Sequence, residues 1–303
     1  MAGYILTVFT SSDATVTAKK DSKMYTTSAD SMGVATFKKL TKGIWTITAI
    51  KGSLITTTEV DMQDDCSIEI TLSNIPDFTY DGIYKIYNGR GEDITYNPEA
   101  AGNWKIEFLT SGKLAFNKLY GAENGIDVFC VGGGGSGGYG ESDGGGGGGY
   151  TTTKLGCSVE VDKEYKIVIG SGGQSVNASG GNTSAFGVTA NGGKGPSRIW
   201  CGANGGSGGG SQFRNGGSDG GGGGTYSDVI DYRAYGGTGQ GTTTREFGES
   251  DGKLYAGGGG GAGGAGGAGG GGDSGKNGET NTGGGGGRGA LGGSGIVVIR
   301  NKR

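Results

Sequence analysis

The side chains in this sequence best suited to chemistry are aromatic and basic residues that interrupt long runs of glycine. Tyr, Trp and Arg dominate binding hot spots, and a mixture of Tyr, Ser and Gly is typical of antibody loops. Such residues stack on sugar rings or fill protein pockets, so the expected chemistry is non-covalent recognition. The candidate binding residues are Arg198, Trp200, Phe213, Arg214, Tyr226, Tyr232, Arg233, Tyr235, Arg245, Phe247 and Tyr255. The alternative for each residue is an apolar cover over a glycine-rich core.

Catalytic chemistry is disfavoured by the same composition. The chain has no histidine, which removes Ser-His-Asp and Cys-His arrangements and the commonest metal ligand. The stretch GGGDSGKN nearly fits the phosphate-binding pattern GxxxxGK[ST], but Asn277 stands where the magnesium-binding hydroxyl belongs and no strand precedes it. We therefore expect no enzyme, no cofactor and no metal.

Charge and hydropathy exclude further classes of partner. The net charge is −3, and there are 12 basic residues in residues 1–130 and 14 in the remainder. Neither part therefore has the clustered basic residues that bind nucleic acid. No apolar stretch approaches the ~18 residues of a membrane span, and the amino terminus lacks the pattern of an export signal. We expect no nucleic acid, no membrane insertion and no export.

The recognition residues must be positioned by the glycine runs between them. Glycine accounts for 11 residues of 1–130 and 66 of 131–303. Between Gly257 and Gly272 every residue is glycine except three alanines spaced three apart, which is the repeat of a polyproline II helix. The sequence predicts one rod of roughly 50 Å, bundled with others by main-chain hydrogen bonds. The residues expected to form this rod include Gly257, Gly264, Gly267, Ala262, Ala265 and Ala268.

A flexible linker is the alternative interpretation of such composition. It is disfavoured by apolar, strand-like words within the glycine-rich part, including EYKIVIG, NTSAFGVTANGG and a closing GIVVIR. The four cysteines contain no CxxC pair and are expected to be buried free thiols, although two disulfides remain open.

The amino-terminal part predicts a separate all-β module. Seven short segments rich in Thr, Val and Ile follow one another every 8 to 12 residues between residues 4 and 73, which is typical of a β-sandwich. In the fifth segment, alternation places Trp45, Ile47 and Ala49 on one face. We expect an attachment module at 1–74 and a glycine-rich domain at 75–303, with a turn-rich bridge near 75–81, lead-in strands to 131, glycine rods and loops at 132–295, and a closing strand at 296–301.

Two resemblances add to this interpretation. GVATFKKLTKGIWTITA resembles the carboxypeptidase-regulatory or Ig-like modules of bacterial surface proteins and virions. The ordered words SGKLAF, VGGGGSGG, EYKIVIGSGG, NTSAFG, ANGGKG and GGSGIVVIR resemble the glycine-rich domain of bacteriophage tail and fibre proteins, in particular T-even-like distal tail-fibre adhesins. That resemblance implies stacked polyglycine II helices whose connecting loops contact the host receptor, and essentially no α-helix.

The expected function is therefore a non-enzymatic phage virion protein, made in the host cytoplasm, that recognises a host surface protein or glycan. Its expected partners also include other virion proteins of the fibre, tail or capsid, contacted through the amino-terminal module, and a homotrimer is one assembly left open. A capsid decoration protein or head fibre is the first alternative, and a bacterial surface adhesin is the second.

Overall fold

The computed structural model describes residues 3–52, 54–70, 72, 75–96, 103–139, 144–197, 201–211, 236, 239 and 241–301. The chain divides into two compact units. Unit 1 comprises Met1–Pro76 with Asn88–Trp104, and unit 2 comprises Asp77–Tyr87 with Lys105–Arg303. The all-β expectation is confirmed, since the helical elements among the described residues are two short 3₁₀ turns, η1 (Gly241–Thr244) and η2 (Glu246–Gly248).

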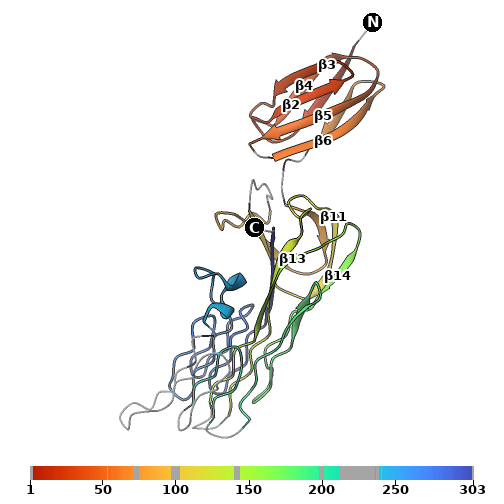
Figure 1. The fold of residues 1–303 in the computed structure, drawn as a ribbon. Coiled ribbons are helices and arrows are strands. Elements are labelled where there is room, and N and C mark those ends of the chain that lie inside the picture. Colours follow the sequence, from red (N-terminus) through yellow and green to blue (C-terminus); the bar gives the residue numbers. More distant parts are fainter. Residues whose placement is uncertain are drawn as a thin grey trace. The chain divides into compact units, whose positions relative to one another are not determined.

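Unit 1 is a two-sheet sandwich built from the seven strands that the sequence predicts. The strands are β1 (Tyr4–Phe9), β2 (Thr15–Lys20), β3 (Lys23–Ser28), β4 (Val34–Leu40), β5 (Gly43–Lys51), β6 (Leu54–Met62) and β7 (Cys66–Glu69). One sheet has the order β4-β1-β7 and the other β3-β2-β5-β6. Figure 1 labels all four strands of the second sheet. Trp45, Ile47 and Ala49 are fully buried between the sheets, as their alternation predicts, and Ile44 on the opposite face is exposed.

The remaining strands form two further sheets and a hairpin in unit 2. These strands are β8 (Asp77–Tyr80), β9 (Tyr84–Asn88), β10 (Trp104–Phe108), β11 (Gly112–Lys118), β12 (Ile126–Val131), β13 (Thr151–Cys157), β14 (Glu164–Ile167), β15 (Thr183–Ala185), β16 (Val188–Ala190) and β17 (Ile296–Asn301). The sheet orders are β13-β12-β17-β10-β9 and β14-β11-β8, and β15 and β16 form a hairpin. The closing strand β17 lies between β12 and β10 with almost every residue buried, so the last part of the described chain completes the core.

The expected bridge near 75–81 is partly wrong, because β8 occupies most of it. This strand pairs antiparallel with β11. Its Phe78 ring lies 6.5 Å from the Phe116 ring and 5.2 Å from the Tyr84 ring, so aromatic packing stabilises the strand. The turn-forming residues around it led the sequence analysis to predict a bridge instead. The strand β13 was likewise absent from the expectation, although its TTTKLGC sequence is rich in β-formers.

The glycine-rich segments of unit 2 lie side by side as extended traces without ladder pairing, visible in Figure 1 as thin green and blue lines. Successive N–H groups of residues 145–150 donate in turn to three neighbouring segments, and each neighbour is used again three residues later. The donor and acceptor pairs are Gly145 to Gly210, Gly146 to Gly286, Gly147 to Lys194, Gly148 to Ser207, Gly149 to Gly283 and Tyr150 to Asn191. The same period of three recurs across residues 132–138. Main-chain hydrogen bonds therefore replace a side-chain core here.

Glycine is required in these segments because neighbouring backbones touch. A Cβ built on Gly285 would lie 2.1 Å from the carbonyl oxygen of Gly146, and one on Gly134 would lie 2.0 Å from that of Gly284. Real Cβ atoms essentially never approach other atoms this closely. The glycines are thus a packing requirement and not a sign of a flexible linker.

The expectation of one straight rod over residues 257–272 is wrong. The chain reverses at Ala262 and Gly263, where the N–H of Gly264 donates to the carbonyl of Gly261 at 3.0 Å, and turns again at 268–270, where Gly269 and Gly270 have φ of 90° and 93°. The returning Gly267 donates to Gly258 at 2.8 Å. Of the three alanines, Ala262 is buried, while Ala265 and Ala268 are exposed. Without Cβ atoms the chain turns at little steric cost, so the run packs against itself.

Candidate recognition surface

Most of the predicted binding residues lie outside the part of the chain that the structure describes. These are Arg198, Trp200, Phe213, Arg214, Tyr226, Tyr232, Arg233 and Tyr235. The structure describes the other three, Arg245, Phe247 and Tyr255, in one segment, residues 241–256, which includes η1 and η2.

Two of these three residues are core residues, which corrects their placement on a binding surface. Tyr255 is fully buried and Phe247 is 8% exposed. Their rings lie 5.4 Å and 5.8 Å from the ring of Phe129 on β12. The aromatic side chains of this segment therefore cover one face of the five-stranded sheet, which is the alternative that the sequence left open for each aromatic.

Arg245 is half-buried and contributes to the shape of its own segment. Its guanidinium donates to the carbonyl of Gly252 at 3.0 Å, and its backbone forms a bridge with Leu254. The side chain thus closes the loop that follows η2. A binding role for its exposed part stays a prediction.

A buried ionic network fastens the same segment to the sheet. The Arg300 guanidinium lies 3.2 Å from Asp127, 2.8 Å from Glu249 and 3.9 Å from the centre of the Phe247 ring. Asp127 also accepts a hydrogen bond from the backbone N–H of Gly156 at 3.0 Å. Buried charges are tolerated only when paired in this way.

Lys105 on β10 forms the second part of this network. It lies 3.2 Å from Glu107 and 3.0 Å from Glu246, which accepts a hydrogen bond from the Tyr255 hydroxyl at 3.0 Å. Burial lowers the pKa of Lys105, but Glu246 and Glu107 outweigh it and the pKa is raised. Burial and then Glu246 raise the pKa of Tyr255. Every contact of this network lies within unit 2, so the network joins the segment 241–256 to the five-stranded sheet.

Sequence reasoning missed this network because its partners are distant in the chain. Arg300 and Asp127 are 173 positions apart, and Lys105 and Glu246 are 141 apart. The only signal was the type of residue: Asp127 and Arg300 are charged positions inside the otherwise apolar words GIDVFCV and GIVVIR. A charge in a strand that must be buried indicates a partner, without identifying it.

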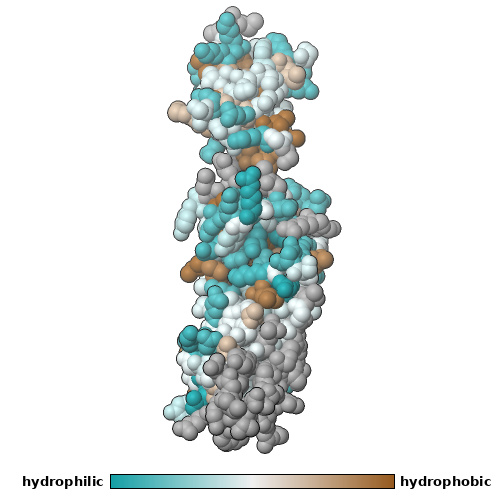
Figure 2. Space-filling view, turned by 90° about the vertical axis from the view of Figure 1, so that its left-hand side faces the viewer, coloured by the Kyte–Doolittle hydropathy of each residue, from teal (hydrophilic) through white to brown (hydrophobic). Residues whose placement is uncertain are grey.

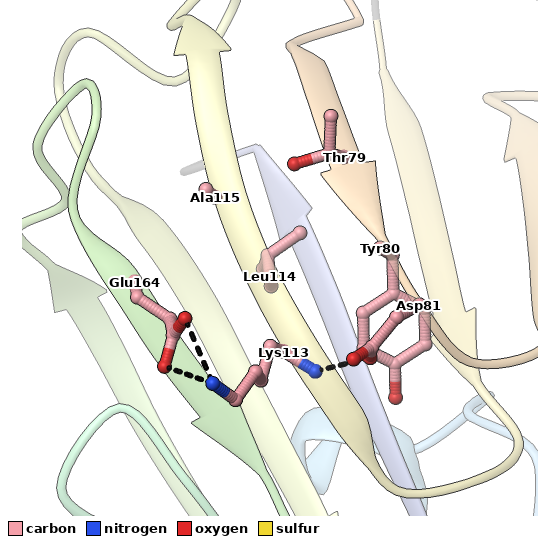
Figure 3. Close-up of a pocket in the computed structure, with 7 residues that line it drawn as sticks. All are labelled: Thr79, Tyr80, Asp81, Lys113, Leu114, Ala115 and Glu164. Carbon is pink, nitrogen blue, oxygen red and sulfur yellow. Dashed lines mark hydrogen bonds and ion pairs between the residues drawn. The ribbon is translucent and has the colours of Figure 1, made fainter.

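A hollow of about 310 Å³ lies over β8, β11 and β14 (Figure 3). Lys113 lies 3.1 Å from Glu164, and its backbone N–H donates to Asp81 at 2.6 Å. The Tyr80 hydroxyl donates to the carbonyl of Thr110, and burial, followed by the charge of Asp81, raises the pKa of Tyr80 to about 12. The polar groups of this hollow satisfy one another, so it offers a ligand few free partners.

The four cysteines are free thiols, as expected, with Cys130 and Cys157 buried and Cys66 and Cys201 half-buried. Burial raises the pKa of Cys130 to about 12, with a smaller contribution from Cys157. Only the thiolate is a nucleophile, so Cys130 is inert at neutral pH.

We predict that alkaline pH destabilises unit 2 partly through Cys130. Below pH 9.0 the thiol is neutral in both states; above it the unfolded chain ionises while the folded chain resists to about pH 12, so stability falls as pH rises. The slope reaches up to about 1.4 kcal/mol per pH unit for one group. Urea unfolding between pH 8 and pH 10 checks this, and Cys130→Ala should flatten the decline. An equal decline in the variant would contradict the assignment.

On the face shown in Figure 2, hydrophobic residues form small patches separated by hydrophilic ones. Within the described ranges, no cluster of three or more His, Cys, Asp or Glu side chains is arranged to bind a metal ion. Among the same residues, no helix has the length and apolar character needed to cross a membrane.

Comparisons with known proteins bear on the glycine-rich part. A family model described as a glycine-rich domain matches residues 110–302. No curated protein matches the chain. Among solved structures, a DUF3823 family protein from Bacteroides ovatus ATCC 8483 is similar over 65% of this chain and 100% of its own, at 12% identity and a TM-score of 0.21. A likeness at that level carries no argument about fold or function.

Proposed function

This chain belongs to the glycine-rich domain family through residues 110–302, and from that premise we propose that it is a non-enzymatic virion protein of a tailed bacteriophage, a tail-fibre or appendage adhesin that recognises a host surface protein or glycan. The observation that carries the proposal is the three-residue hydrogen-bonding period of the glycine segments. Three residues per turn is the repeat of polyglycine II helices, the architecture of the phage adhesins that the sequence resembles.

A bundle of this kind is a scaffold with few side chains of its own. Residues 132–138 and 144–149 are buried, and apart from Ser136 they are all glycine. Specific recognition needs side chains, since hot spots are made by aromatic and arginine residues in defined pockets. Recognition therefore falls to the residues that join one glycine segment to the next.

Most of the candidates fall within residues 212–235, which lie outside the described part of the chain. Of the described residues that flank this range, Ser211 is fully buried, and the N–H of Gly236 donates to Ala265 at 2.7 Å. The candidates in this range are Phe213, Arg214, Tyr226, Tyr232, Arg233 and Tyr235, and Arg198 and Trp200 precede it in the sequence.

Unit 1 has a different role in this proposal. It has a core of its own, formed by residues such as Leu6, Trp45 and Met62, and its strands carry no glycine except Gly43. We assign it the attachment to other fibre, tail or capsid proteins of the virion, in one copy or as a homotrimer. The virion is then the protein's location.

The test is binding of the purified full chain to host cells, envelope extracts and a glycan array. We predict that Trp200→Ala and Tyr235→Ala each weaken binding at least tenfold, because truncating a hot-spot aromatic costs about 2 kcal/mol or more. Their melting temperatures should match that of the parent chain. The matched control is Tyr96→Ala, since Tyr96 is a fully exposed aromatic residue outside the glycine-rich family match.

Two outcomes would contradict this proposal. Absence of binding by the intact chain to every host surface tested would favour the alternative of a capsid decoration protein or head fibre. Binding that survives both aromatic substitutions would move the receptor site to another part of the molecule.

A further inference from the structure

The hairpin of β15 and β16 carries an aromatic residue where the backbone disfavours one. Its two turn residues, Phe186 and Gly187, have φ of 49° and 73°. A two-residue hairpin turn with both φ values positive is ordinarily Asn-Gly or Asp-Gly. For a bulky residue such a φ is a genuine outlier, with a cost of about 1–3 kcal/mol, and such outliers cluster at active sites and ligand clamps.

Packing holds the Phe186 ring in this position. The ring lies 5.0 Å from that of Tyr165 on β14, with 37° between the planes. Tyr165 in turn lies 6.0 Å from the buried Phe116 on β11. The strained residue is therefore the outermost member of an aromatic row that begins in the core, and it stays half-buried. Part of its ring faces solvent.

That ring borders a pocket of about 380 Å³, within the ordinary range for ligand sites. The pocket is formed by the end of β13, the turn that follows it, β14 and the hairpin tip. The lining residues are Lys154, Cys157, Ser158, Lys163, Glu164, Tyr165, Lys166, Phe186 and Gly187. Three lysines and one glutamate thus line the pocket together with an aromatic pair.

The charges of the lining leave the pocket positive. Lys163 is paired with Glu160, and Glu164 is paired with Lys113 on the neighbouring strand at 3.1 Å. In the described part of the chain, Lys154 and Lys166 have no carboxylate within ion-pair distance. Burial raises the pKa of the Cys157 thiol, and the charge of Lys154 opposes this, so the Lys154 ammonium acts at the pocket wall.

We propose that this pocket binds an anionic sugar residue, with the sugar ring stacked on Phe186 and the carboxylate or phosphate held by Lys154 and Lys166. The Tyr165 ring supports Phe186 from behind and carries the Lys163 ammonium 5.7 Å from its centre. Aromatic faces suit the apolar side of a pyranose, the free ammonium groups suit its anion, and the Ser158 hydroxyl and Glu164 offer hydrogen-bond partners to sugar hydroxyls. Its residues are different from the candidates at 198–200 and 212–235. It gives the strand-built part of the glycine-rich domain a binding role of its own.

The experiment titrates the full chain with glucuronic acid, glucose 6-phosphate, glucose and inorganic phosphate, followed by calorimetry and by NMR. We expect the two anionic sugars to bind at least about tenfold more tightly than glucose or phosphate, a difference of about 1.4 kcal/mol. Comparison of the first two probes separates uronic-acid polysaccharides from phosphorylated sugars as the source.

Three variants make the test specific. Lys154→Met should weaken binding about tenfold by removing one unpaired charge. Phe186→Asn should also weaken it about tenfold while leaving the melting temperature unchanged, because Asn-Gly relieves the turn strain and offsets the lost ring contact. Lys38→Met, an exposed lysine in unit 1, is the control and should bind as the parent does.

Equal affinity for glucose and glucuronic acid would contradict the proposed role of the lysines in binding the anion. If phosphate binds as tightly as glucose 6-phosphate, and Phe186→Asn does not change that affinity, the pocket does not recognise the sugar ring. No binding of either anionic sugar would overturn the site altogether. Each result is independent of receptor binding through Trp200 and Tyr235, so the two proposals fail separately.

Discussion

Replacement of Gly146 by alanine is expected to unfold the glycine-rich part of unit 2. The new Cβ would lie 2.1 Å from the carbonyl oxygen of Gly135 and 2.7 Å from that of Ser136. Gly146 itself donates to Gly286 at 2.8 Å and accepts from Gly259 at 2.9 Å, so no side of it is free to move. If these segments separate, buried N–H and C=O groups lose their hydrogen-bond partners, which costs about 1–3 kcal/mol for each group. The expected loss is more than about 4 kcal/mol, from one methyl group.

Thermal unfolding followed by calorimetry checks this prediction, because unit 1 has a separate core and its transition should stay in place. The matched control is Gly275→Ala in an exposed turn, where nothing lies within 4 Å of the new Cβ but φ is +79°. The control should cost about 1–2 kcal/mol from its left-handed backbone alone. A Gly146→Ala variant as stable as this control would show that the glycine segments are not packed at main-chain distance.

Arg300→Met is expected to destabilise unit 2 by about 3–5 kcal/mol, since it leaves buried charge without a partner. The side chains of Arg300 and Asp127 are only 8% and 4% exposed. Loss of the guanidinium also releases Glu249 and the Phe247 ring, so the segment 241–256 loses its attachment to the five-stranded sheet. Urea unfolding measures the loss, and faster hydrogen exchange in residues 241–256 localises it.

The control for this prediction is Lys113→Met, which breaks an ion pair whose side chains are 63% and 59% exposed. Exposed pairs contribute about 0–1 kcal/mol, so this variant should be close to the parent. A second arm combines Arg300→Met with Asp127→Asn. The amide still accepts from Gly156 but carries no charge, so part of the stability should return. If the double variant is no more stable than Arg300→Met, the uncompensated charge is not the cause.

Strand positions follow from the sequence wherever one short-range rule governs them. All seven strands of unit 1 form where β-rich words alternate with turns, and Trp45 is buried because alternation along a strand has a period of two. The closing strand lies at its expected place for a related reason: four apolar β-branched residues, Ile296 to Ile299, follow a glycine-rich stretch. The strand β8 was missed because its stability comes from β11 and from ring contacts across the sheet.

Such short-range rules predicted less of the candidate site. Residue types singled out the aromatic and arginine positions, but type alone does not separate a hot spot from a core residue. Phe247 and Tyr255 face Phe129, which is more than a hundred positions away in the chain. The sequence did not predict the pocket beside Phe186, because β13, β14 and the tip of the β15–β16 hairpin come together only in the folded chain.

The amino-acid sequence by itself determined the class of this protein: all-β, with a second part in which glycine supports packing by the main chain. The β-rich segments predicted the first property and the glycine content the second, because a backbone without Cβ atoms approaches its neighbours closely enough to exchange hydrogen bonds. Only the tertiary structure decided that the run at 257–272 folds back on itself. For glycine, a straight segment and a turn differ little in conformational free energy. The conformation is therefore determined by the neighbouring segments and by the backbone groups on them that need hydrogen-bond partners.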